Sequence, residues 1–179
     1  ADILRAQQRL VGGVLDTPVL RSATLDLLAG AELFFKCEHQ QVTGSFKARG
    51  ALNAVLSLTE AQARQGVATH SSGNHGAALA WAAASRGLPA YIVVPENAAI
   101  VKKRNISRYG AEIIECESTL PAREAALAAV VARTGANFIP PYDDARIIAG
   151  QGTTGLEVMA AVPDLDDIVT PVGGGGLLA

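Results

Sequence analysis

The sequence predicts an α/β protein in which a parallel sheet carries helices on its faces. Short apolar runs rich in valine and isoleucine alternate with helical stretches of about 10 to 15 residues, the spacing that βαβ units require. The composition agrees, since 49% of the 179 residues are hydrophobic but only 4% are aromatic. A core of small aliphatic side chains suits close packing of helices on a sheet.

The clearest alternation lies between residues 65 and 140. We predict, in order, strand 66–70, helix 77–86, strand 90–94, helix 100–109, strand 111–116, a helix that ends at 134, and strand 137–139. Thr119 or Ser118 is a candidate N-cap for the last helix, and Pro121 falls in its first turn. Gly110 and Gly135 follow their helices, as glycines at helix C-termini commonly do.

The flanking segments are expected to form a second unit. They are predicted to hold an N-terminal helix, strand 32–38, a helix from about 46 to 58, a helix through 156–159 and strand 167–172. Residues 65–140 would then be a small α/β domain. It is inserted between the two parts, 1–64 and 141–179, of a larger domain.

Charge and cysteine content exclude several classes of partner. The 15 basic and 17 acidic side chains give a net charge of −2, so neither nucleic acid nor an anionic membrane is expected as a partner. No apolar run approaches the roughly 18 residues that cross a bilayer. Cys37 and Cys116 have no CxxC companion, which argues against a zinc site or a disulfide framework and favours a cytoplasmic location.

The segment Thr43-Gly44-Ser45-Phe46-Lys47 places a lysine where a predicted turn enters a helix. The positive end of the helix dipole disfavours a cation, so the pKa of Lys47 is expected to be lowered. An amine with a lowered pKa suits Schiff-base chemistry. A solvated surface lysine is the alternative.

The segment Ser71-Ser72-Gly73-Asn74-His75-Gly76 lies between a predicted buried strand and a helix. Hydroxyls, an amide and free N–H groups at a helix N-terminus form a pocket for a carboxylate or a phosphate. Ser72 is a candidate acid or base, or equally the helix cap. His75 is either catalytic or held by local hydrogen bonds.

Four consecutive glycines, Gly173, Gly174, Gly175 and Gly176, follow a predicted strand. They leave successive N–H groups free to surround an anion. The run matches neither G-x-G-x-x-G nor G-x-x-x-x-G-K-[ST], which disfavours a nucleotide-binding domain. A flexible tail is the alternative.

These three segments, in this order, resemble the fold-type II pyridoxal-phosphate enzymes, specifically the group of serine/threonine dehydratases (ammonia-lyases) and serine racemases. The resemblance begins at Thr17-Pro18-Val19-Leu20 and ends at the glycine run; between them it includes segments 35–38, 43–50, 70–76, 90–95 and 148–153. It implies the tryptophan-synthase-β-like fold. In that family the larger domain continues well beyond the glycine run, so we expect this chain to stop inside that domain.

The resemblance implies a role for each motif residue. Lys47 is similar to the lysine that forms the Schiff base and moves the Cα proton, Phe46 to the residue beside the cofactor ring, and Asn74 to the asparagine that hydrogen-bonds the ring 3-hydroxyl. Ser72 stands where racemases place a proton donor opposite the lysine. The glycine run resembles the phosphate cradle, and the substrate carboxylate is expected on Ser71, Ser72, Gly73, Asn74 and His75.

The implied function is a pyridoxal 5′-phosphate-dependent serine/threonine ammonia-lyase, which forms a 2-oxo acid and ammonia by α,β-elimination. The close alternative is a serine racemase that uses Lys47 and Ser72 on opposite faces of the substrate. An inactive pyridoxal-phosphate-binding fragment is the alternative from another class. The resemblance also implies a homodimer acting on a small amino acid. In several members a divalent cation such as Mg²⁺ binds residues beyond the glycine run, so no metal ligand is named here.

Overall fold

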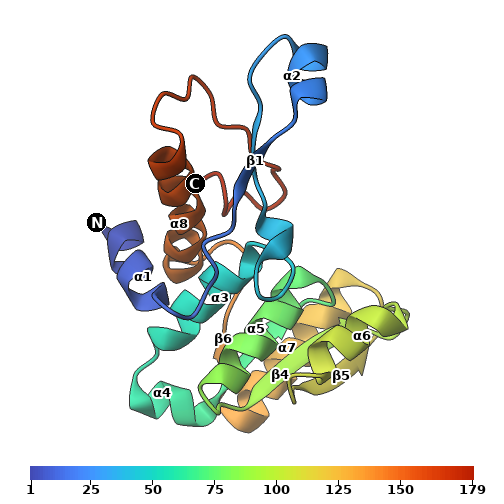
Figure 1. Cartoon of the computed structure of the whole chain (residues 1–179). Coiled ribbons are helices and arrows are strands. Elements are labelled where there is room, and N and C mark those ends of the chain that lie inside the picture. Colours follow the sequence, from blue (N-terminus) through green and yellow to red (C-terminus); the bar gives the residue numbers. More distant parts are fainter.

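The computed structural model describes all 179 residues and confirms the α/β class (Figure 1). Its centre is a four-stranded sheet with the order β5-β4-β3-β6, in which every neighbouring pair is parallel. The strands are β3 (Val67–His70), β4 (Ala90–Pro95), β5 (Glu112–Cys116) and β6 (Asn137–Phe138). All four strands predicted between residues 65 and 140 are therefore present, each within one or two residues of its expected bounds.

The helices that connect these strands are α5 (Asn74–Ser85), α6 (Ile100–Ser107) and α7 (Leu120–Thr134). Thr119 is the N-cap of α7, since its side chain accepts a hydrogen bond from the backbone N–H of Ala122. Gly135 ends α7 in the left-handed conformation, as expected. Helix α5 begins three residues earlier than predicted, so that Asn74 and His75 lie in its first turn.

The order of the strands creates a switch point between β3 and β6. From β3 the chain proceeds outward to β4 and β5, and it then returns to place β6 on the other side of β3. Ligands of open parallel sheets bind at the carboxyl ends of the strands at such a point. The segments that leave these two ends are residues 71–73 and residues 139–144, so the fold itself selects them as candidate site segments.

The flanking segments form the remaining layer. It comprises α1 (Asp2–Leu10), β1 (Val19–Arg21), α2 (Ala23–Ala29), β2 (Phe34–Lys36), the 3₁₀ turn η1 (Glu38–Gln40), α3 (Lys47–Leu56), α4 (Glu60–Gln65) and α8 (Ala145–Ala161). Strands β1 and β2 form a separate antiparallel pair, which projects with α2 away from the helices (Figure 1). The strand expected over 32–38 is thus present but shorter.

The strand predicted over 167–172 is wrong. These residues form no regular structure, and Val169 is 93% exposed. An apolar run becomes a strand only where a neighbouring strand completes its hydrogen bonds, and none lies beside this segment.

Helices α3 and α8 cross at two glycines. A β-carbon on Gly150 would lie 2.6 Å from the Cα of Gly50 and 2.7 Å from the carbonyl oxygen of Arg49, so the two backbones touch. In the same contact, the side-chain oxygen of Gln151 accepts a 3.1 Å hydrogen bond from the Gly50 N–H. The crossing fixes the helix that begins with Lys47 against the helix that follows the 139–144 segment.

The larger of two apolar clusters joins the flanking layer to the sheet, and the smaller one lies under α7. The larger cluster extends from Leu10 of α1 through α3, α5 and the sheet to Ile147 of α8. Eight residues of α5 are buried on all sides of that helix, because α5 packs between α3 and the sheet. The core is continuous across the boundaries at 64/65 and 140/141, so the division into two domains stays a prediction.

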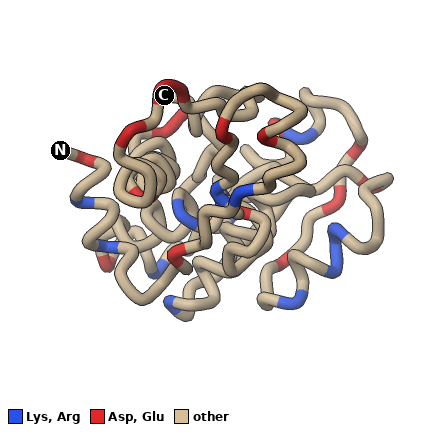
Figure 2. Tube along the Cα trace, turned by 45° about the horizontal axis from the view of Figure 1, so that its top comes forward, with Lys and Arg blue, Asp and Glu red and all other residues tan.

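Acidic and basic residues are interspersed along the trace (Figure 2). The longest helix, α8, has 17 residues, and no helix has the length and apolar character to span a membrane.

Candidate cofactor site

Lys47 is the first residue of α3, and the turn before it depends on Gly44. Gly44 has φ +78° and donates a 2.7 Å hydrogen bond to the carbonyl oxygen of Gln41. The Nζ atom of Lys47 donates a 2.5 Å hydrogen bond to the carbonyl oxygen of Pro141. Burial lowers the pKa of Lys47, and no carboxylate pairs with the amine. Lys47 is thus a half-buried amine rather than a solvated surface lysine.

A cavity of about 220 Å³ brings Lys47 and the glycine run together. It is lined by Phe46, Lys47, Tyr142, Pro171, the four glycines and Leu177. The backbone N–H groups of residues 173–176 donate no hydrogen bond within the chain. Four free N–H donors form a site for an anion. Because the Lys47 amine lies beside them, the same ligand can also carry a group that reacts with amines.

Glycine is required in this loop for two reasons. A β-carbon on Gly174 would lie 2.1 Å from the ring of Tyr142, and one on Gly176 would lie 2.9 Å from the Tyr142 carbonyl oxygen. Gly175 has φ +84°, which side chains rarely adopt. A β-carbon on Gly173 would meet nothing within 4 Å, so this glycine faces open space.

The loop between β3 and α5 is a tight turn with an uncapped helix end. A β-carbon on Gly76 would lie 2.0 Å from the carbonyl oxygen of Ser71, which only glycine avoids. Gly73 is the N-cap of α5 and no side chain caps the helix, so the reading of Ser72 as the cap is wrong. The Oγ of Ser71 instead accepts a 3.4 Å hydrogen bond from the Gly73 N–H. Ser72 is partly exposed, and its hydroxyl is free for other chemistry.

His75 is buried and neutral. Its Nε2 lies 3.0 Å from the carbonyl oxygen of Ile139, and its Nδ1 has no partner. Burial is the main cause that lowers the pKa of His75 to about 4, and the positive charge of Lys47 contributes. His75 and Lys47 therefore both hydrogen-bond to backbone carbonyls of the segment 139–141.

The structure brings together only part of the predicted set. Phe46, Lys47 and the glycine run share one cavity, whereas His75 contacts the carbonyl oxygen of Ile139, which does not line it. Residues 71–75 do not line that cavity, and Asn74 is exposed, so the roles assigned to Ser71, Ser72, Gly73, Asn74 and His75 stay predictions. Tyr142 was not predicted. Its place in the segment that leaves β6, at the switch point of the sheet, is the signal that could have found it.

Comparison with known proteins identifies the family. The family described as "Pyridoxal-phosphate dependent enzyme" matches residues 10–179. The chain belongs to the pyridoxal-phosphate dependent enzymes. This confirms the fold and the cofactor class that the motifs implied.

Relatives within this family have two kinds of activity in their names. The chain is 50% identical to a serine racemase of Dictyostelium discoideum over 178 residues, which cover 99% of the chain and 55% of that protein. It is 49% identical to a β-hydroxyaspartate dehydratase of Paracoccus denitrificans, with 99% of the chain and 56% of that protein covered. The chain therefore spans little more than half the length of these relatives.

Solved structures agree. The crystal structure of the Dictyostelium discoideum serine racemase has a TM-score of 0.95 at 50% identity, covering 99% of this chain and 58% of that one. The crystal structure of a threonine deaminase from T.th. has a TM-score of 0.90 at 42% identity, covering 99% of this chain and 57% of that one.

The residues present fit pyridoxal phosphate. The N–H groups of 173–176 are free to donate hydrogen bonds, as a phosphate requires. The loop also needs glycine, because a β-carbon at Gly174 or Gly176 would collide with Tyr142, whereas Gly173 faces open space. The Lys47 amine, whose pKa burial lowers, matches the aldehyde. Both groups line the same cavity.

Proposed function

We propose that this chain is the cofactor-binding part of a pyridoxal-phosphate-dependent amino-acid racemase acting on serine or a similar hydroxy amino acid. The observation that carries the proposal is the cavity shared by the Lys47 amine and the free N–H groups of the glycine run. The 50% identity to a serine racemase supports racemisation over the ammonia-lyase that the motifs alone suggested.

In this proposal the cofactor, when bound, withdraws electrons from the substrate and makes its Cα–H acidic. Residues 173–176 hold the phosphate through their N–H groups. The Lys47 amine takes the Cα proton, and its lowered pKa keeps more of it in the neutral form that accepts a proton. The free N–H groups at the start of α5 bind the substrate carboxylate.

Ser72 is the proposed second proton carrier. Its hydroxyl is not used to cap α5 and is partly exposed at the carboxyl end of β3. Donation of the Ser72 hydroxyl proton to the face opposite Lys47 inverts the substrate, and proton exchange with solvent then restores both groups. Asn74 is the proposed partner of the cofactor ring.

An ammonia-lyase is the second candidate, and the 49% identity to a β-hydroxyaspartate dehydratase favours it. The proton taken by Lys47 is the same in both reactions. Loss of the β-hydroxyl after that step leads to a 2-oxo acid and ammonia. The two reactions then differ only in the fate of the deprotonated substrate.

The test is to incubate the purified protein with L-serine and L-threonine and to measure the D-enantiomer and the 2-oxo acid together. D-serine as the major product supports the racemase, and oxo acid alone supports the lyase. Imine absorbance without either product identifies the inactive-fragment alternative. The unaltered protein should show a visible imine absorbance that borohydride abolishes. The role of Lys47 would be overturned if this absorbance were missing, or if it were still present in Lys47→Ala.

We also infer a homodimeric, cytoplasmic enzyme with two domains, 65–140 and the combination of 1–64 and 141–179. Leu27 and Leu28 of α2 are 84% and 78% exposed, which supports a further packing partner for this face. Sedimentation analysis tests the dimer. Limited proteolysis near residues 65 and 140 tests the division into domains.

A further inference from the structure

Arg49 is the largest fully buried side chain of the molecule, and it is charged. Its guanidinium forms two-pronged hydrogen bonds with two carboxylates. The distances are 2.7 and 2.9 Å to Glu38, and 2.6 and 2.7 Å to Glu157. The Oγ of Thr153 at 3.2 Å and the carbonyl oxygen of Leu15 at 3.3 Å accept further bonds. A buried charge is tolerated only when it is paired and hydrogen-bonded in this way.

Glu157 also pairs with a second cation, Lys36. Lys36 Nζ lies 2.5 Å from Glu157 Oε2 and 3.1 Å from Asp16 Oδ1. Thr17 Oγ1 donates a 2.6 Å bond to Glu38. Burial alone would raise the pKa of Glu38 and lower that of Arg49. Burial is the largest single cause for each group, but the hydrogen bonds and charges of all their partners together outweigh it, so the pKa of Glu38 is lowered and that of Arg49 is raised.

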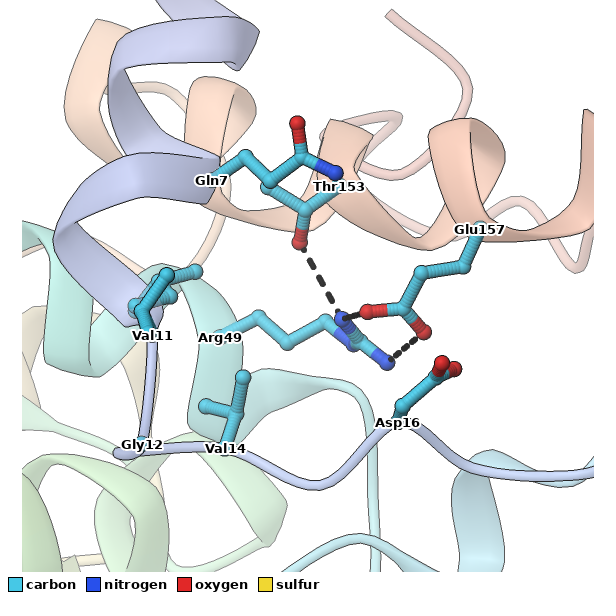
Figure 3. A pocket seen from close by; sticks show the side chains of 9 residues that line it. Gln7, Val11, Gly12, Val14, Asp16, Arg49, Thr153 and Glu157 are labelled. Atoms are coloured by element: carbon cyan, nitrogen blue, oxygen red, sulfur yellow. Dashed lines mark hydrogen bonds and ion pairs between the residues drawn. The ribbon is translucent and has the colours of Figure 1, made fainter. Parts of the chain in front are cut away.

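The Arg49 cluster, defined as Arg49, Glu38, Glu157, Thr153 and Lys36, joins segments that are far apart in the sequence. Figure 3 shows Arg49 extending from α3 toward Thr153 and Glu157 of α8, with Asp16 nearby. Thr153 and Glu157 lie three and seven residues after Gly150, on one face of α8. The close crossing at Gly150 brings that face within reach of Arg49.

Apart from the Arg49 cluster, no ion pair holds the beginning of α3. Its N-cap residue, Phe46, makes no side-chain cap, and its first turn has no acidic residue but two cations, Lys47 and Arg49. Two cations at a helix N-terminus are unfavourable unless carboxylates compensate them. At 3.6 residues per turn, residues two apart point about 200° apart around the helix. The cluster thus holds one side of the first turn, and Lys47 extends from the other.

We propose that Arg49, held by Glu38 and Glu157, is a positioning residue that fixes the first turn of α3 and so keeps the Lys47 amine in the cavity of the glycine run. This inference rests on the proposed function. It assigns Arg49 no contact with cofactor or substrate. Its role is to place the amine for the reaction with the aldehyde, whereas the glycine run binds the phosphate independently.

The test separates binding from placement in two conservative variants, Arg49→Lys and Glu157→Gln. Lysine keeps the charge but loses the two-pronged geometry, and glutamine keeps the shape but loses the charge. The matched control is Glu112→Gln, which removes a carboxylate from the exposed pair with Arg133, where the side chains are 52% and 58% exposed. The cofactor is stripped from each purified protein and replaced by pyridoxal phosphate or by 4′-deoxypyridoxine phosphate, which has no aldehyde.

We expect the rate of imine formation, followed by its visible absorbance, to fall about tenfold or more in both cluster variants, since a misplacement near 1 Å can cost about a hundredfold. The affinity for the deoxy compound should stay within about twofold of the unaltered protein, and Glu112→Gln should change neither value. Circular dichroism at the assay temperature shows that the variants are folded.

Three results would overturn the inference. One is an unchanged imine rate in both folded variants. Another is an equal loss of affinity for both compounds, which would assign the cluster to general stability. The third is failure of both variants to fold, which leads to the same conclusion. An unaltered protein without any Lys47-dependent imine would instead overturn the proposed function itself.

Discussion

The Nζ atom of Lys47 donates its hydrogen bond to the carbonyl oxygen of Pro141, 94 positions further along the chain. The acceptor lies in the segment that leaves β6, and the donor opens α3. This contact places a helix start from the flanking layer beside the carboxyl edge of the sheet. Tyr142, the residue after Pro141, lines the same cavity as Lys47.

Two adjacent glycines of the loop should respond differently to alanine. Gly174→Ala places a methyl group inside the Tyr142 ring and should lower the stability of the cofactor-free protein by about 1 to 3 kcal/mol. Gly173→Ala meets no protein atom, so it should leave that stability unchanged while weakening binding of pyridoxal phosphate. Thermal unfolding and a fluorescence titration check this pair. Equal changes in stability and in cofactor affinity for the two variants would contradict the assignment of the glycine run as the phosphate site.

The helix crossing can be tested within α8. Gly150→Ala drives a methyl group into the backbone of α3 and should destabilise the protein by at least about 2 kcal/mol. Gly155→Ala, in the same helix but with open space around it, should stabilise by about 0.5 to 1 kcal/mol through helix propensity. Urea unfolding measures both changes. The crossing would be refuted if Gly150→Ala were neutral.

His75 should make stability depend on pH. Its pKa is about 4 in the folded protein, below the ordinary value of 6.5, because burial disfavours the charged ring. The unfolded chain therefore binds more protons between these values. Stability is full above pH 6.5 and falls by about 3 kcal/mol as the pH decreases toward 4.

The variant His75→Gln should flatten this part of the profile, since an amide can donate to Ile139 without titrating. His39→Gln, at an exposed position, should leave the profile unchanged. Chemical unfolding at a series of pH values gives the comparison. A slope that survives in His75→Gln would assign the pH dependence to other groups.

Ser72→Ala should separate the two reactions. If Ser72 returns the proton, formation of D-serine falls about a hundredfold or more, whereas oxo acid formation continues. Ser71→Ala removes the neighbouring hydroxyl and should affect both products alike through substrate binding. Chiral chromatography and an oxo acid assay on the same samples provide the readout. Unchanged D-serine formation in Ser72→Ala would exclude it as the proton donor.

Features with local causes were predictable from the sequence. The four parallel strands are apolar runs bounded by glycine or proline, and the Thr119 cap is set by residues within one helical turn. The glycine run and Lys47 were found because their residue types suit an anion and an amine site. Their common cavity follows only from the fold.

Features that depend on distant partners were not predictable. The run at 167–172 looks like a strand but has no neighbour to pair with. Arg49 follows Lys47 by two residues, yet its partners Glu38 and Glu157 lie 11 and 108 positions away, and no local pattern marks the guanidinium as buried. Tyr142 reaches the glycine run for the same reason: the folded chain, rather than spacing, brings them together.

The apolar core that runs without interruption from Leu10 to Ile147 has a consequence for how the protein opens. Helix α5 is enclosed by α3 on one side and the sheet on the other, so neither neighbour can detach without exposing it to water. The backbone amides of α3, α5 and the inner strands β3 and β4 should therefore exchange with deuterium together, in one global event. Those of the projecting β1–α2–β2 segment should exchange earlier and independently.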